Sequence, residues 1–140
     1  MMMSESLNNQ RNFYNIKTTD AAILIVDDDS TIRKALADVL SITTAVIYTA
    51  ANGQEGIEIF QQQRHISLVL LDMNMPVLNG EQTYEKLQEI APEVKVIISS
   101  SLSQAEARLR FNQRELLTYL QKPYDINTLL HTVHTKLAIA

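Results

Sequence analysis

The sequence contains no cysteine and only three glycines in 140 residues. The absence of cysteine excludes disulfides, thiolate zinc sites and cysteine nucleophiles, and it suits a reducing compartment. No G-x-G-x-x-G or Walker loop is present, so no motif supports nucleotide binding. No apolar run approaches the roughly 18 residues of a membrane span. Residues 1–19 are polar and rich in asparagine, and they lack the apolar core of a signal peptide. We therefore expect a cytoplasmic protein without membrane contact.

The composition is that of an ordinary globular protein, with 46% apolar and 20% charged residues. A chain of this length predicts one domain with a core large enough to fold alone. We expect this domain over residues 21–140, preceded by a flexible tail or linker at 1–20. The net charge of -4 argues against a nucleic-acid-binding surface for the chain as a whole.

Strand-like and helical patterns alternate from residue 22 to the end of the chain. Apolar runs at 23–26, 45–49, 66–71, 94–99 and 117–120 predict five strands, each followed by a segment with helical periodicity. The first of these helices places Ile32, Ala35, Leu36, Val39 and Leu40 on one face. Ser103-x-x-Glu106 is a capping box that opens the fourth helix. Continuous apolar strands favour a parallel sheet buried on both faces. Right-handed crossovers then place helices on both sides, which gives an α/β, doubly wound (βα)5 fold.

Polar side chains follow four of the five predicted strands. Asp27 and Asp28 end the first strand, Asp72 the third and Ser100 the fourth, and Lys122 comes just after the fifth. The carboxyl ends of the strands form the ligand site of an open parallel sheet, so these groups should converge. A cluster of carboxylates repels itself unless a cation neutralises it. Mg²⁺ suits such oxygen ligands, and a carboxylate can act as a nucleophile toward phosphorus.

Together these motifs resemble the receiver domain of two-component response regulators. The resemblance rests on Asp27-Asp28, on Asp72 with Met75-Pro76 and Gly80, on Ser100, and on Lys122-Pro123. It covers about residues 21–138, and four separated elements fall in the expected order on the expected strands. It implies the flavodoxin-like fold, with a five-stranded parallel sheet in the order 2-1-3-4-5.

The resemblance also implies roles for the residues at the strand ends. Asp72 would accept a phosphoryl group, with Mg²⁺ held by Asp28, Asp72 and the backbone carbonyl of Asn74. Asp27 would contribute mainly through a metal-bound water. Lys122 would pair with the phosphoryl group, next to a peptide bond to Pro123 that is usually cis in this family.

Two further residues match the switch positions of the family. Ser100 would be the switch hydroxyl, and Tyr119 the aromatic side chain that turns inward on phosphorylation. The surface of the fourth helix, fifth strand and fifth helix would then change and contact a downstream protein. The phosphodonor would be a sensor histidine kinase or a histidine phosphotransfer protein. The chain would be a signalling switch rather than a turnover enzyme, either stand-alone or the receiver of a hybrid kinase, and a homodimer through the fourth and fifth helices is one expected assembly.

The sequence departs from the family pattern next to the switch hydroxyl. Ser101 stands where alanine or glycine is usual, and this larger residue is expected to narrow the access of small phosphodonors to Asp72. Asn74 and Leu102 occupy the two positions that tune dephosphorylation in the family, so the phosphoryl lifetime should differ from that of chemotaxis receivers.

Two other interpretations remain open at this stage. Asp27-x-Asp29-x-Thr31 also fits the D-x-D-x-T opening of haloacid-dehalogenase-like phosphohydrolases, in which Asp27 would be the nucleophile and Asp29 the general acid. Those enzymes need a late acidic pair for Mg²⁺, whereas Asp125 is the only acid after residue 116. The other interpretation is a pseudo-receiver that serves only as a binding module, although three desolvated carboxylates are costly to keep without a metal.

Overall fold

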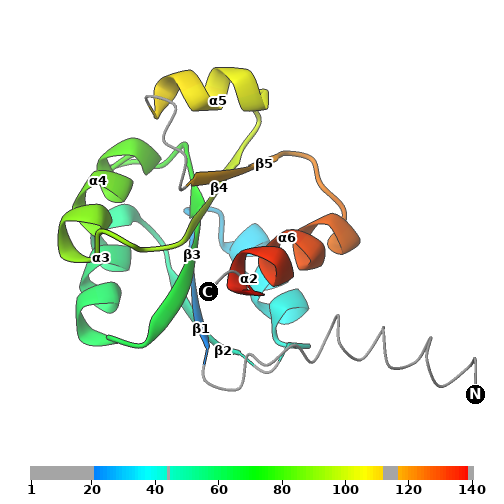
Figure 1. Ribbon diagram of the computed structural model, residues 1–140, viewed down its shortest axis with the longest axis horizontal. Coiled ribbons are helices and arrows are strands. Elements are labelled where there is room, and N and C mark those ends of the chain that lie inside the picture. The colour runs from blue at the N-terminus through cyan, green and yellow to red at the C-terminus, as the bar shows by residue number, and fades with distance from the viewer. Residues whose placement is uncertain (1–20, 44, 112–116, 139–140) are drawn as a thin grey trace, which may run out of the picture.

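The computed structural model describes residues 21–43, 45–111 and 117–138, and Figure 1 shows strands and helices that alternate along this part of the chain. The first half contains β1 (Ala22–Val26), α2 (Ser30–Leu40), β2 (Val46–Ala50), α3 (Gly53–Gln62) and β3 (Ile66–Asp72). The second half contains α4 (Gly80–Ile90), β4 (Val96–Ser100), α5 (Gln104–Arg110), β5 (Leu117–Gln121) and α6 (Ile126–Ala138).

The five strands form one sheet in the order β2-β1-β3-β4-β5, and every neighbouring pair is parallel. This confirms the predicted doubly wound fold and its strand order. Each parallel connection needs a crossover of a dozen or more residues, which the helices supply. The strand order reverses between β1 and β3. The connections that follow these two strands therefore begin side by side, at the carboxyl ends of the strands, and lead away from each other.

The sheet divides the core into two halves, because successive side chains of a strand point to opposite faces. On one face, Ile23 and Ile25 pack with apolar residues of α2 and α6. On the other face, Leu24 and Val26 pack with apolar residues of α3, α4 and α5. The strands β3 and β4 divide their side chains in the same way, so they are buried on both sides, as their continuous apolar runs predict.

Side chains at the helix starts satisfy the free backbone N–H groups of the first turn. The Asp29 carboxylate accepts hydrogen bonds from the backbone N–H groups of Thr31 and Ile32, so it is the N-cap of α2. The predicted capping box at Ser103 and Glu106 is present at the start of α5. Asn79 forms a second capping box, with Gln82 at the start of α4. This second box fixes where the helix begins after the loop that follows Asp72.

Two details of the sequence prediction were wrong. The fourth strand was expected to begin at Val94, but the Val94 N–H donates to the Ala91 carbonyl in a turn, and the strand begins two residues later. Ile32 was placed on the apolar face of its helix, yet it is 36% exposed. It lies in the first turn of α2, whose buried residues, Leu36 and Leu40, belong to later turns. The apolar periodicity of a helix does not show where the sheet beneath it ends.

Among the described residues, no helix has both the length and the apolar character needed to cross a membrane.

Candidate functional site

Two neighbouring strands bring their terminal carboxylates together. Asp27 directly follows β1, Asp72 is the last residue of β3, and these strands are paired in the sheet. The side chains of Asp27, Asp28 and Asp72 each offer a carboxylate oxygen, and these oxygens all lie within 4.8 Å of one another. Asp27 and Asp72 are only 3% and 6% exposed, whereas Asp28 is exposed to solvent. The result is an acidic cluster that opens to solvent on the side of Asp28.

Lys122 supplies the positive charge of the site from the connection between β5 and α6. Its Nζ lies 3.3 Å from Asp72 Oδ1 and 4.0 Å from Asp27 Oδ2. Its backbone N–H donates to the Ser100 carbonyl at 2.7 Å, which fixes the connection against the end of β4. The Lys122–Pro123 peptide bond is cis, as the resemblance implied. The structure thus brings together Asp27, Asp28, Asp72 and Lys122.

The acidic cluster is electrostatically strained in the absence of a cation. Burial, followed by the negative charge of Asp27, raises the pKa of Asp72 from 3.8 to about 6, although the Lys122 ammonium opposes the shift. Burial also raises the pKa of Asp27, although a hydrogen bond from the Asp29 backbone N–H favours its charged form. Lys122 therefore offsets only part of the cost of holding these carboxylates together.

The residues of this cluster fit a hard divalent cation. The donors are three carboxylates, with no sulfur or imidazole ligand beside them, which suits Mg²⁺ or Ca²⁺ better than Zn²⁺. The backbone N–H of Asn74 lies 3.4 Å from Asp72 Oδ1, so this residue follows the acid closely at the edge of the site. A bound cation would favour the charged forms of Asp27 and Asp72, which burial and neighbouring negative charge disfavour by raising both pKa values.

The two predicted switch residues lie on neighbouring strands beside the acidic cluster. Ser100 is the last residue of β4 and is 3% exposed, and its hydroxyl accepts a hydrogen bond from the Leu102 backbone N–H. Tyr119 lies in the middle of β5 and is 8% exposed, so its side chain is turned inward. Ser99, rather than Ser100, pairs directly with Asp72 across the sheet.

A series of aromatic rings continues from Tyr119 into the face of the sheet that carries α4 and α5. Phe111 lies 6.1 Å from the Tyr119 ring and 5.9 Å from the Tyr84 ring, measured between centroids. On the outer side, the Arg108 guanidinium lies 6.0 Å from the Tyr119 centroid. The next arginine of α5, Arg110, forms an ion pair with Glu81 in the first turn of α4, at 2.7 Å. These contacts join α4, the helix that follows the loop after Asp72, to α5.

The sequence analysis missed three residues at or beside the site, which are Arg33, Ser99 and Tyr124. The Arg33 guanidinium donates to the Asp27 carbonyl at 2.7 Å. The Ser99 hydroxyl donates to the Tyr124 hydroxyl at 3.4 Å, and burial raises the pKa of Tyr124. None of the three belongs to a motif. Ser99, a polar residue that directly precedes Ser100 at the end of an apolar run, was the one signal that could have been read from the sequence.

The geometry does not favour the phosphohydrolase alternative. Asp29 would have to act as a general acid, but its carboxylate is exposed and accepts two backbone N–H groups at the start of α2. The acids that surround Asp27 come instead from Asp28 and Asp72.

Comparison with known proteins gives a consistent family. The family described as response regulator receiver domain matches residues 23–134. The chain is 32% identical over 111 residues to sporulation initiation phosphotransferase F of Bacillus subtilis. The matched region covers 79% of this chain and 89% of that protein. It is 29% identical over 118 residues to the autoinducer 1 sensor kinase/phosphatase LuxN of Vibrio harveyi. The matched region covers 84% of this chain but only 14% of that much longer protein.

Solved structures agree with the sequence relatives. A response regulator receiver domain protein from Clostridium thermocellum superposes with a TM-score of 0.75 at 30% identity, covering 84% of this chain and 94% of that chain. A chain of the CheX-CheY-BeF3-Mg²⁺ complex from Borrelia burgdorferi superposes with a TM-score of 0.74 at 27% identity, covering 81% of this chain and 87% of that chain. The strand order, the acidic cluster and these matches lead to one conclusion: the chain belongs to the family of response regulator receiver domains.

Proposed function

We propose that Asp72 is the phosphoacceptor of this receiver and that Asp27, Asp28, Asp72 and the Asn74 carbonyl hold Mg²⁺ beside it. The observation that carries the proposal is the convergence of three carboxylates within 4.8 Å, with the Lys122 ammonium 3.3 Å from Asp72. A structural salt bridge would need one acid for one lysine, whereas this edge holds two buried acids and a third beside them.

The reaction that this geometry supports is the transfer of a phosphoryl group from a phosphohistidine. An oxygen of the Asp72 carboxylate attacks phosphorus while the P–N bond to the imidazole breaks, and the imidazole leaves with the bonding electron pair and takes up a proton. The product is an acyl phosphate on Asp72. With a pKa of about 6, Asp72 is largely ionised at neutral pH and is therefore available as the nucleophile.

Positive charge near Asp72 stabilises the phosphoryl oxygens during this step. When bound, Mg²⁺ neutralises charge on the phosphoryl oxygens. Lys122 is placed to donate a hydrogen bond to the same group, because its Nζ lies 3.3 Å from the Asp72 carboxylate. Ser101 is exposed and lines a hollow of about 460 Å³ with Lys122, Ile32, Pro123 and Tyr124, so it borders the approach to this side of the site.

In the phosphorylated state, Ser100 would hydrogen-bond the phosphoryl group, and the Tyr119 ring would become fixed in the inward position that it already occupies in this structure. The surface formed by α5, β5 and α6 would then report the state of Asp72 to a downstream protein. The phosphodonor is proposed to be a sensor histidine kinase or a histidine phosphotransfer protein, and the match to a sensor kinase/phosphatase supports this class of partner. We place the receiver over residues 21–140 and in the cytoplasm, as a signalling switch without substrate turnover.

The test is to incubate the protein with acetyl phosphate, with and without Mg²⁺, and to read the intact mass. We expect one added phosphoryl group that requires both Mg²⁺ and Asp72. The Asp72→Asn variant should remain unlabelled while keeping its fold, and persistent labelling would contradict the assignment. If the wild-type protein is unlabelled, a phosphorylated histidine phosphotransfer protein replaces acetyl phosphate, because Ser101 narrows access for small donors.

Asp29→Asn is the matched control for this experiment. Asparagine caps helices as well as aspartate, so the variant removes a nearby charge without removing the cap. Phosphorylation should be unaffected. Turnover of p-nitrophenyl phosphate that is lost in Asp27→Asn, but not in Asp72→Asn, would instead support the phosphohydrolase alternative.

A further inference from the structure

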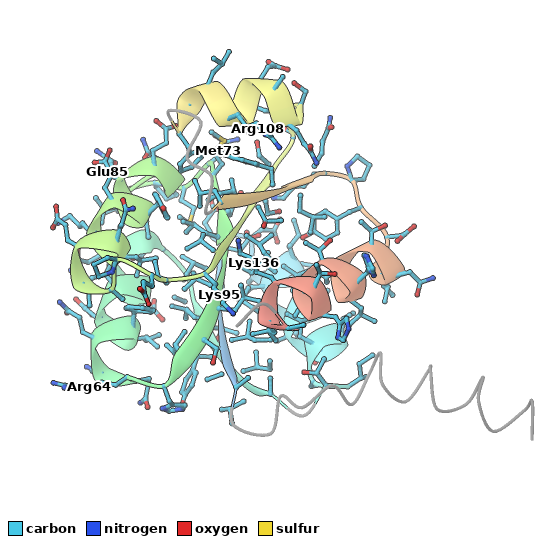
Figure 2. All side chains as sticks on the ribbon, in the orientation of Figure 1. Arg64, Met73, Glu85, Lys95, Arg108 and Lys136 are labelled. Atoms are coloured by element: carbon cyan, nitrogen blue, oxygen red, sulfur yellow. The ribbon has the colours of Figure 1, made fainter. Side chains whose placement is uncertain are left out.

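A second concave site lies at the edge of the sheet where the strands begin. It has a volume of about 790 Å³, within the range typical of ligand sites. It lies between the last turns of α3 and α4 and the first residues of β3, while Asp72 ends the same strand at the opposite edge. Figure 2 shows Arg64, at the rim of this pocket, and Arg108, on α5, at opposite ends of the molecule.

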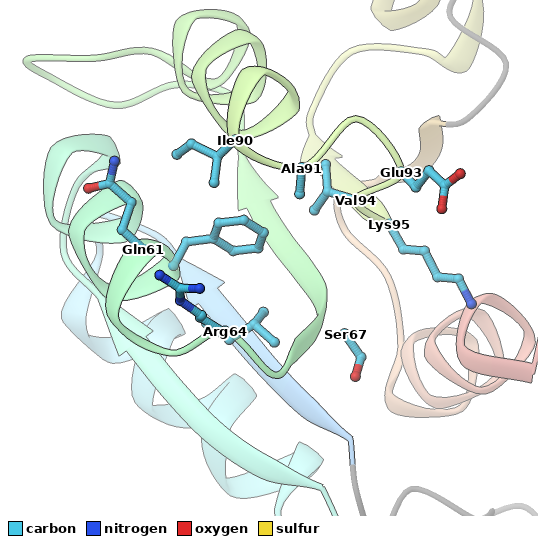
Figure 3. Close-up of a pocket in the computed structure, with 10 residues that line it drawn as sticks. Gln61, Arg64, Ser67, Ile90, Ala91, Glu93, Val94 and Lys95 are labelled. Atoms are coloured by element: carbon cyan, nitrogen blue, oxygen red, sulfur yellow. The ribbon is translucent and has the colours of Figure 1, made fainter.

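The pocket has an apolar floor and a polar rim. Phe60, Ile66 and Val94 form much of this floor, and Ile90 is 41% exposed at its side. Figure 3 shows that the Lys95 side chain extends away from Ile90 toward the helix drawn in red, so its ammonium does not face the apolar part of the pocket. The floor of the pocket therefore fits apolar side chains, while Arg64 and Glu93 add charge at its rim.

Polar groups at one rim suit the backbone of a docked segment. Gln61 and Arg64 lie on the α3 side, and among the described residues neither forms an ion pair or a hydrogen bond through its side chain. Ser67 lies at the start of β3 on the lower side of the pocket (Figure 3). The side-chain N–H groups of Gln61 and Arg64 can hydrogen-bond the carbonyl groups of an extended segment lying over the pocket, whereas the Ser67 hydroxyl donates to the His65 carbonyl.

The described chain enters the fold at this same edge. The Ala21 carbonyl accepts a hydrogen bond from the Val46 N–H, and Ala22 pairs with Ile66, a residue of the pocket floor. Twenty residues precede Ala21, and they include the run Phe13-Tyr14-Asn15-Ile16. At about 3.3–3.6 Å per residue, the five residues from Ile16 to Ala21 can span roughly 17 Å. Since paired strands lie about 4.8 Å apart, the run can reach the pocket.

The composition of this run matches the pocket. Phe13 is one of three phenylalanines in the chain, and the other two, Phe60 and Phe111, are buried in the core. Between Leu7 and Ala21, the large apolar side chains are Phe13, Tyr14 and Ile16. We propose that the pocket between α3 and α4 is the docking site of residues 13–16 of this chain, with Phe13 and Tyr14 against the apolar floor. This inference concerns the edge opposite Asp72 and is independent of the phosphorylation chemistry.

The absence of cysteine allows a direct test in the full-length protein. Asn12→Cys provides a unique attachment point for a spin label, and methyl NMR signals report which side chains lie close to it. We expect the signals of Ile90 and Val94 to lose most of their intensity. Ile42 and Val46 serve as internal references, because both are about half exposed at the same edge but lie outside the pocket.

Equal loss at the reference residues and at Ile90 would overturn the proposal, because a segment without a preferred site would reach Val46 first. A double substitution, Phe13→Ser with Tyr14→Ser, should restore the Ile90 and Val94 signals. The matched double substitution Asn8→Ser with Asn9→Ser should leave the losses unchanged.

A change on the pocket side provides a second, independent test. Ile90→Asp alters an exposed residue, so the fold should tolerate it, and it should abolish the selective loss at Val94. Persistence of that loss in either the Phe13 or the Ile90 variant would place the run elsewhere and refute the docking.

Discussion

Replacing Asp72 by asparagine should stabilise the metal-free protein at neutral pH. In the wild-type protein, burial and the charge of Asp27 raise the pKa of Asp72 from 3.8 to about 6. A shift of about 2 units corresponds to roughly 3 kcal/mol against the ionised form, at about 1.36 kcal/mol per unit. This shift is already net of the Lys122 contact, which lowers the pKa, so the loss of that contact is not subtracted again. Asparagine should therefore raise the free energy of unfolding by about 2–3 kcal/mol.

The pH dependence of this gain follows from the direction of the shift. Between pH 3.8 and about 6, folded Asp72 binds more protons than unfolded Asp72, so the wild-type protein loses stability as the pH rises through this range. Below this range the carboxyl is protonated in both states, and the penalty is absent. The advantage of Asp72→Asn should thus appear between pH 4 and pH 6 and remain constant at higher pH.

Thermal unfolding in EDTA, at several pH values from 4 to 8, measures this difference. At pH 7.5 we expect the midpoint of Asp72→Asn to lie about 8–12 °C above that of the wild type. Asp38→Asn is the control, since Asp38 is an exposed acid on α2 and its replacement removes the same charge without relieving burial. A lower midpoint for Asp72→Asn at pH 7.5, or a gain that does not depend on pH, would refute the reasoning. Added Mg²⁺ should stabilise the wild type more than the variant.

Three other substitutions test separate parts of the structure. Lys122→Ala should retain Mg²⁺ binding in a calorimetric titration but lose the phosphorylation-dependent change in the Tyr119 NMR signals. A large loss of Mg²⁺ affinity would contradict the proposed role of Lys122 as a contact of the phosphoryl group. Val77→Gly should raise the free energy of unfolding by about 1 kcal/mol in a urea titration. Val77 is 79% exposed and has a φ of 70°, a backbone conformation that disfavours β-branched residues. An unchanged unfolding midpoint would contradict this expectation. Gly80→Ala should destabilise the protein by more than about 2 kcal/mol in the same assay. The new Cβ would lie 2.8 Å from Met73 Cα and 2.9 Å from the Asp72 carbonyl oxygen. If the variant is as stable as the wild type, the loop that follows Asp72 can move to make room for the methyl group.

The strands and the acids at their ends were predictable because they are local features. A run such as 66–71 is apolar on both faces only when helices cover both sides, and an acid that directly follows it must lie at the edge of the sheet. The strand order then determines which acids meet. The assignments of Asp72, Lys122, Ser100 and Tyr119 to chemical roles remain proposals, since geometry alone does not test them.

Contacts between distant positions were not predictable from the sequence. The stacking of Arg108 on Tyr119 and the ion pair between Arg110 and Glu81 depend on how α5 lies against its neighbours, and no periodicity encodes this. The exposure of Ile32 was missed for a related reason, because the length of the sheet beneath a helix is a property of the whole fold.

The division of the core by the sheet has a consequence for how this protein can evolve. Ile25 contacts only the half-core of α2 and α6, while its neighbour Val26 contacts only the half-core of α3, α4 and α5. A change of side-chain volume in one half-core can therefore be compensated by other side chains of the same half-core. The two half-cores are coupled only through the rigid backbone of the strands between them. Substitutions should covary within each half-core and vary independently between them. Lineages can thus remodel the helices on one face for new partners while the opposite face keeps its old ones.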